Sequence, residues 1–108
     1  MVSTVRKKIR QMTRRIVKKF DPNKVILFGS YAKGTATKDS DADLLIVMPV
    51  SGSKREKGVE IGVELHDVHI PKDIIVTTPE EMERRKNIVG TIAYIATREG
   101  KVLYERQP

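Results

Sequence analysis

The sequence contains no cysteine and no tryptophan, and its 108 residues include only two phenylalanines and three tyrosines. Without cysteine, neither a disulfide framework nor a thiolate metal site can form. No apolar run approaches the roughly 20 residues that a membrane-spanning helix needs. The first ten residues also lack the apolar segment of a signal peptide. We therefore expect a cytoplasmic protein that forms a single domain over residues 1–108.

Positive charge is concentrated near the N-terminus. The net charge is +7, and eight Lys and Arg residues precede the first acidic residue, Asp21. The apolar residues of this segment recur at the spacing of one helix face; they are Val5, Ile9, Met12, Ile16, Val17 and Phe20. The spacing predicts an amphipathic helix that packs on a sheet and turns its cations to solvent. The same cations could instead contact a nucleic-acid backbone or an acidic partner, although no aromatic residues alternate with them to stack on bases.

The rest of the chain predicts short strands that alternate with helices. Apolar runs predict strands at residues 24–28, 41–48 and 72–77, followed by a short strand at 101–104. Residues 59–65 alternate as in a strand but also fit a helix. The pattern indicates an α/β (α+β) fold, with a small mixed central β-sheet and helices packed on it.

Two helices are predicted in the C-terminal third. Thr78, Pro79 and Glu81 form a typical helix start, with Thr78 as the cap and Pro79 at the first position. A further helix is predicted to begin near Asn87 and to end at Gly100.

The turn after the first predicted strand has the features of a phosphate site. Gly29 and Ser30 directly follow the strand at 24–28. A glycine lets the backbone approach a phosphate with no Cβ in the way, and the serine hydroxyl and the N–H groups of the turn can bind an anion. The pair therefore predicts a seat for the phosphates of a nucleoside triphosphate.

Three aspartates are the candidate metal ligands. Asp41 and Asp43 lie two residues apart on a predicted strand, so their side chains leave the same face. Such carboxylates repel unless they are protonated or bridged by cations, and Mg²⁺ prefers carboxylate and phosphate oxygens. If the strand that begins near Asp73 lies alongside, the three can hold two Mg²⁺ ions. Solvated strand ends often carry an Asp-x-Asp pair, but the order of strand, Gly-Ser, spacer, Asp-x-Asp and third Asp favours a functional site.

These segments resemble the DNA polymerase β-type nucleotidyltransferase superfamily and, within it, the minimal nucleotidyltransferases. The matching segments are residues 28–34, 40–47, 73–80 and 99–105. The resemblance implies the polymerase β-like nucleotidyltransferase fold and a helix over residues 54–67. It also implies the activity, which is the transfer of a nucleoside monophosphate, AMP from ATP, to a hydroxyl acceptor.

The resemblance also assigns roles to individual residues. Gly29 and Ser30 would bind the triphosphate, and Lys33 occupies a position where the family often has a basic residue that assists the phosphates. Lys33 could equally be a solvated lysine. The implied catalytic residues and ligands of a two-Mg²⁺ site are Asp41, Asp43 and Asp73.

The same resemblance implies a partner. Minimal nucleotidyltransferases of this size are commonly encoded beside a small helical HEPN-type toxin, and they act as its antitoxin by transferring AMP to one of its tyrosines. Two alternatives remain open: a non-catalytic antitoxin that binds its partner by contact alone, and a nucleotidyltransferase directed to nucleic acid by the basic N-terminal segment. No membrane partner is expected.

Overall fold

The computed structural model describes residues 3–108, which form strands and helices in alternation. In chain order the elements are α1 (Ser3–Phe20), β1 (Lys24–Phe28), α2 (Ser30–Lys33), β2 (Ala42–Val47), α3 (Lys54–Glu64), β3 (Lys72–Thr77), α4 (Pro79–Arg85), α5 (Ile92–Glu99) and β4 (Lys101–Glu105).

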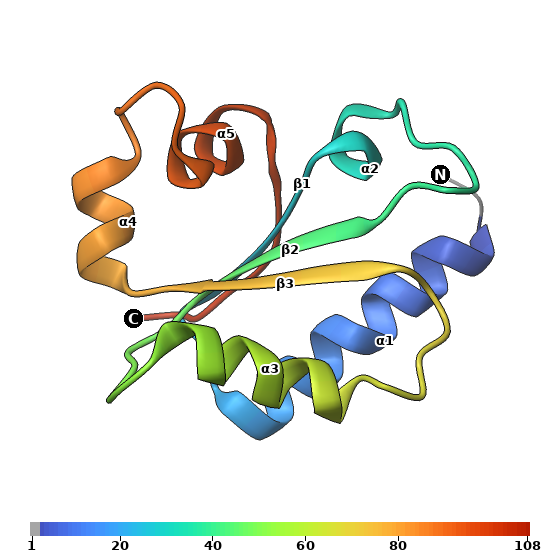
Figure 1. Ribbon diagram of the computed structural model, residues 1–108, viewed down its shortest axis with the longest axis horizontal. Coiled ribbons are helices and arrows are strands. Elements are labelled where there is room, and N and C mark those ends of the chain that lie inside the picture. Colours follow the sequence, from blue (N-terminus) through green and yellow to red (C-terminus); the bar gives the residue numbers. More distant parts are fainter. Residues whose placement is uncertain (1–2) are drawn as a thin grey trace.

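The strands form a four-stranded sheet in the order β3-β2-β1-β4. β1 pairs antiparallel with both β2 and β4, whereas β2 and β3 run parallel. Helices α1 and α3 cover one face of the sheet, and α4 and α5 lie over the other (Figure 1). The predicted α/β fold with a small mixed sheet is confirmed.

The two central strands are apolar along their length because helices cover both of their faces. Val25, Leu27, Leu44 and Ile46 face the α1–α3 side, where they belong to one buried cluster with Ile9, Met12, Ile16, Ile61 and Leu65. Ile26, Phe28, Leu45 and Val47 face the opposite side and pack with Ala96 of α5. Successive residues therefore alternate between two cores, which explains the continuous apolar runs.

Helix α1 is amphipathic, as its spacing predicts. Ile9, Met12 and Ile16 are buried against the sheet. On a neighbouring side of the helix, Arg15 forms an ion pair with Asp67 at 2.9 Å and Lys19 one with Glu64 at 2.9 Å. Like the other helices in residues 3–108, α1 is not apolar enough to cross a membrane.

Two helix boundaries differ from the predictions. α5 begins at Ile92 instead of near Asn87, because the Thr91 side chain caps it by accepting a hydrogen bond from the Tyr94 N–H. α3 ends at Glu64, short of residue 67. At α4, Thr78 caps as predicted, but the Glu81 carboxylate contacts Lys54 of α3 and so contributes to tertiary structure.

The junction between α5 and β4 leaves no space for a side chain. A Cβ on Gly100 would lie 2.7 Å from Ile26 Cγ2 and 3.1 Å from the Leu27 carbonyl oxygen, and it would overlap the Ala96 carbonyl oxygen. We predict that Gly100→Ala lowers the free energy of unfolding by about 1–3 kcal/mol through overpacking, measured by urea denaturation. Gly62→Ala is the matched control, because nothing lies within 4 Å of a Cβ there. Equal urea midpoints for the two variants would contradict the prediction.

Candidate active site

The turn after β1 begins at Gly29. This residue has a φ of 75°, a region that glycine enters without strain. Its carbonyl oxygen accepts hydrogen bonds from the N–H groups of Ala32 and Lys33, both at 3.1 Å. The short helix α2 then ends at Lys33 and is capped by Gly34, which is left-handed with a φ of 80°. The first N–H groups of a helix have no partner within it, so the start of this turn presents donors beside the Ser30 hydroxyl.

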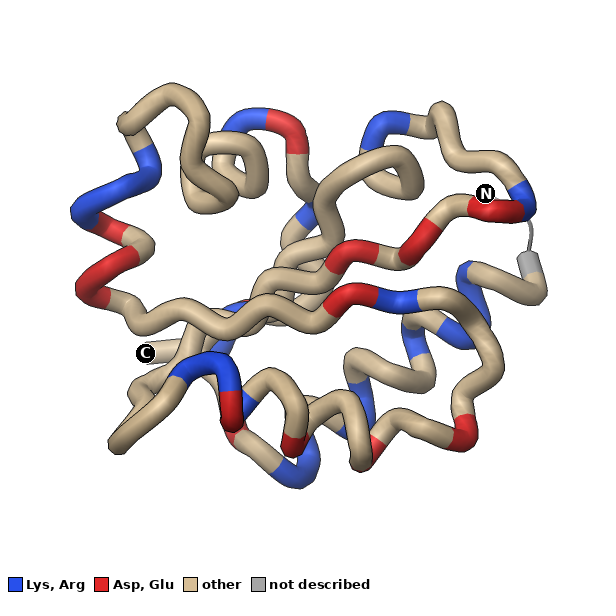
Figure 2. Tube along the Cα trace, in the orientation of Figure 1, with Lys and Arg blue, Asp and Glu red and all other residues tan. Residues whose placement is uncertain are grey.

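Asp43 and Asp73 are lateral neighbours in the sheet. They are register partners in the parallel β2–β3 pair, and neighbouring strands lie about 4.8 Å apart. In the antiparallel pair on the other side of β2, Asp43 is opposite Phe28, the residue before Gly29. The acidic positions of β2 and β3 lie side by side in Figure 2. The register therefore brings Gly29, Asp43 and Asp73 close together at one end of the sheet.

Asp41 precedes β2 and is exposed. The approach to β2 is fixed by a turn in which the Thr37 N–H donates to the Ser40 hydroxyl at 2.8 Å. The Ala42 N–H then donates to the Pro71 carbonyl oxygen at 2.8 Å, which holds the start of β2 against the residue before β3. These hydrogen bonds place Asp41 at the same end of the sheet as Asp43.

The carboxylates influence one another electrostatically. The pKa of the Asp43 carboxyl is raised above its usual value, mainly by desolvation and further by the charges of Asp73 and Asp41. Each of these causes makes the ionised form of Asp43 less favourable. A cation near the three side chains would remove this penalty.

The structure adds a role for Gly29 that sequence reasoning missed. A Cβ at this position would overlap Oδ2 of Asp43 and would lie 3.2 Å from its Cγ. Gly29 is therefore needed for the Asp43 side chain to occupy its position, whether or not a phosphate is bound. The antiparallel pairing of residues 24–28 with 43–47 would have indicated this contact, but the sequence does not specify that register.

Lys33 contacts a residue that the sequence did not single out. Its ammonium lies 3.9 Å from a carboxylate oxygen of Glu99, and about half of each side chain is exposed. A surface ion pair of this kind contributes little to the stability of the fold. The Lys33 side chain can therefore leave Glu99 and reorient at little cost. No local signal links the two residues, because only the packing of α5 beside β1 brings them together.

The carboxylates do not form a ready metal site with their present side-chain positions. Within residues 3–108, no group of three His, Asp or Glu side chains is arranged to hold a metal ion. The donor set still suits a hard cation such as Mg²⁺, because it consists of carboxylate oxygens alone. Asp41 and Asp73 are exposed, so rotation of their side chains meets little steric resistance.

Removing the Asp43 charge should stabilise the metal-free protein. Because the folded-state pKa is raised, the folded state binds more protons than the unfolded chain between the usual and the raised value, and stability falls as pH rises through that window. We predict that Asp43→Asn raises the free energy of unfolding at pH 7 by up to about 1 kcal/mol, because solvent screens much of the repulsion at this partly exposed side chain. Thermal denaturation in EDTA should show this gain shrinking toward pH 3. Asp39→Asn, at an exposed loop position, is the control; an equal gain there, or none at Asp43, would contradict the prediction.

Solved structures share this fold. A Sulfolobus solfataricus protein assigned as a nucleotidyltransferase superposes with a TM-score of 0.60 at 21% identity, over 96% of this chain and 85% of that chain. A toxin–antitoxin structure with AMP-PNP gives a TM-score of 0.52 at 19% identity, over 98% of this chain and 76% of the other. The toxin–antitoxin MntA-HpeT, in a mutant form, gives 0.50 at 18% identity, over 94% and 73%. At these identities the likeness establishes the fold.

A match between this sequence and a protein family identifies the family of the chain. No curated protein matches this sequence significantly. Residues 6–100, however, match the nucleotidyltransferase domain family. This range includes the turn at Gly29 and the aspartates at 41, 43 and 73. With most of its length matched and a fold shared with solved structures, the chain belongs to the nucleotidyltransferase domain family of enzymes.

Proposed function

We propose that this enzyme transfers AMP from ATP to a hydroxyl group of a partner protein and thereby acts as an antitoxin. The observation that carries the proposal is the register that places Asp43 beside Asp73 and next to the Gly29 turn. Carboxylates of two strands and a phosphate-binding turn then meet at one end of the sheet. Nucleotidyl transfer requires these two elements within one site.

Each residue has a distinct role in the proposed reaction. The Ser30 hydroxyl and the N–H groups at the start of α2 bind the triphosphate, and Lys33 assists when it leaves Glu99. The acceptor oxygen attacks the α-phosphorus, the bond from that phosphorus to the bridging oxygen breaks, and pyrophosphate leaves. Asp73, at the edge of the sheet, accepts the proton of the attacking hydroxyl.

Asp41, Asp43 and Asp73 would hold Mg²⁺ once Asp41 and Asp73 turn toward Asp43. When bound, two such cations activate the attacking oxygen and stabilise the leaving pyrophosphate. The raised pKa of Asp43 supports this role, because a carboxylate whose charge is unfavourable in the free protein gains most from a cation.

The acceptor is proposed from the structural neighbours and the family resemblance. Two neighbours are toxin–antitoxin structures, one of them with the ATP analogue AMP-PNP. Together with the resemblance to minimal nucleotidyltransferases, they support a toxin of HEPN type as partner and one of its tyrosines as acceptor. The need for ATP fits a cytoplasmic setting.

Label transfer tests the reaction. The protein, Mg²⁺ and the product of the neighbouring gene are incubated with ATP labelled at the α or at the γ position. We predict that the partner acquires label only from the α position. Asp41→Ala/Asp43→Ala should reduce the transfer by at least about a thousandfold, since the metal ligands stabilise the transition state.

Two results would contradict this proposal. Label from the γ position would indicate a phosphotransferase. Absence of transfer from any of the four nucleoside triphosphates, with the two proteins still bound tightly, would indicate the non-catalytic antitoxin.

The proposed phosphate-binding role of the Gly29 turn can be tested by a binding measurement that requires no turnover. We predict that Ser30→Ala weakens the binding of a non-hydrolysable ATP analogue by about 10- to 100-fold, since a hydrogen bond to a charged group is worth about 1.5–3 kcal/mol. Isothermal titration calorimetry measures the affinity, and Ser51→Ala, in an exposed loop, is the matched control. Unchanged affinity for Ser30→Ala would remove this residue from the site.

A further inference from the structure

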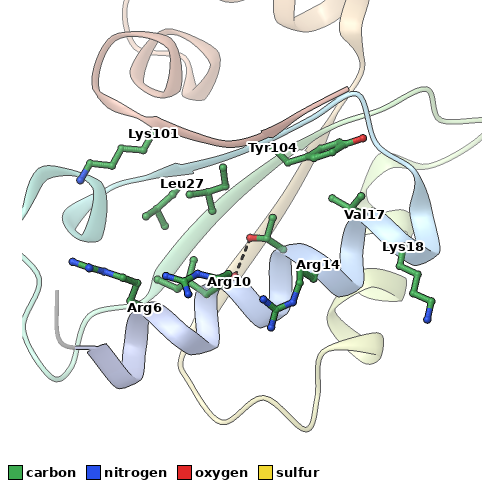
Figure 3. Close-up of a pocket in the computed structure, with 11 residues that line it drawn as sticks. Arg6, Arg10, Arg14, Val17, Lys18, Leu27, Lys101 and Tyr104 are labelled. Atoms are coloured by element: carbon green, nitrogen blue, oxygen red, sulfur yellow. Dashed lines mark hydrogen bonds between the residues drawn. The ribbon is translucent and has the colours of Figure 1, made fainter. Parts of the chain in front are cut away.

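A groove of about 780 Å³ lies between α1 and the sheet, beside β1 and β4. Its floor is largely aliphatic and includes Ile9, Val17, Leu27 and Leu103. Thr13, a polar residue of the lining, donates its hydroxyl hydrogen to the Ile9 carbonyl oxygen at 2.9 Å, the dashed line in Figure 3. The floor therefore presents an apolar surface to a ligand.

Cations border this groove on both sides. Arg6, Arg10, Arg14 and Lys18 line it from α1, and Lys101 lines it from β4 (Figure 3). The four α1 residues are spaced four apart, so they follow one side of the helix. From Arg6 to Lys18 the row extends about 18 Å, at 1.5 Å per residue.

These border cations differ from the cations on the neighbouring side of α1. There, Arg15 and Lys19 are neutralised by Asp67 and Glu64, and the hydrogen bond from Lys19 lowers the pKa of Glu64. Among the described residues, no carboxylate forms an ion pair with any of the five cations that border the groove. The fold thus supplies internal acidic partners on one side of α1 and leaves the groove side positive.

The groove and the candidate active site lie on opposite faces of the sheet. Leu27 of the groove belongs to the cluster on the α1–α3 side, whereas the next residue, Phe28, faces α5. On β2, Asp43 lies on the same side as Leu45 of that second cluster, because side chains two apart share a face. The proposed nucleotide site is therefore separate from the groove.

We propose that the groove binds an amphipathic helix of a partner protein, with the apolar stripe of that helix on the floor and its Asp and Glu residues against the border cations. About three turns of helix match the length of the cation row. An aliphatic floor accepts leucine-like side chains, as in other helix-in-groove interfaces. The inference goes beyond nucleotidyl transfer and does not depend on it.

Other occupants fit the groove less well. Single-stranded RNA would find the cations but little to stack on, since Tyr104 is the aromatic residue among the lining side chains. A second copy of this chain carries a net charge of +7 and would bring further positive charge to a positive groove. An acidic, apolar helix satisfies the floor and the border together.

A displayed library of randomised 16-residue helical peptides, selected on the full-length chain, tests the proposal. Enriched peptides should have apolar residues three and four apart, flanked by Asp and Glu. Fluorescence anisotropy should show that Arg10→Glu/Arg14→Glu weakens the best peptide at least about tenfold, because like charges then face each other. Lys7→Glu/Arg55→Glu makes the same change of net charge at positions outside the groove and should alter affinity less than about threefold.

The floor and the fold are tested separately. Val17→Ser should also weaken the peptide about tenfold, because it places a hydroxyl in the apolar contact. Circular dichroism verifies folding, and affinity for the ATP analogue should stay unchanged in all groove variants. If the wild-type protein failed to bind the ATP analogue but still bound the peptide, the result would count against the proposed function and not against the groove.

Three outcomes would overturn the inference. The first is enrichment of basic peptides or of peptides without an apolar stripe. The second is equal binding of the selected peptide to the wild type and to Arg10→Glu/Arg14→Glu. The third is a 20-nucleotide single-stranded RNA that binds more tightly than any selected peptide and loses affinity in that variant, which would assign the groove to nucleic acid.

Discussion

The candidate site depends on the pairing of β2 with its two neighbours. β2 is antiparallel to β1 and parallel to β3, so the end of β1 and the starts of β2 and β3 meet at one end of the sheet. Burial on both faces fixes this register, because a slip by one residue would exchange the side chains of the two cores. Hydrophobic packing several residues away therefore determines where the charged groups lie, and the positions of the aspartates follow from the core.

This arrangement places an electrostatic penalty inside a small domain. Three aspartates lie near one another, and one of them is partly desolvated. Such a penalty is usual at functional sites, where groups arranged to bind a charged ligand lower the stability of the folded protein. The compensation lies in the two clusters around β1 and β2, and in the ion pairs that attach α1 to α3 and the turn that follows it. Charges that support the fold are thereby separated from charges that are available for ligands.

Sequence reasoning found the elements better than the contacts between them. The four strands, the Gly29 turn and α1 were predictable because strong local signals mark them, whereas α3 was expected only from the family resemblance. The start of α5 was placed too early, near Asn87, although Gly90, which has a φ of 93°, interrupts the apolar run just before the capping residue Thr91. The ion pair between Lys54 and Glu81 and the ion pair between Lys33 and Glu99 depend on segments distant in sequence. No local pattern encodes them, because they follow from the way the helices pack.

The contact between Gly29 and Asp43 constrains how this sequence can diverge. A methyl group at residue 29 would overlap the carboxylate of Asp43 as long as that side chain keeps its present position. A lineage that lost catalysis would therefore be expected to lose the carboxylate first and only afterwards to accept a larger residue in the turn. Among relatives, an alanine or serine at position 29 would then mark a copy in which the acid at position 43 had already shortened or disappeared. The steric contact thus links two positions that are fourteen residues apart and gives their replacement an order in time.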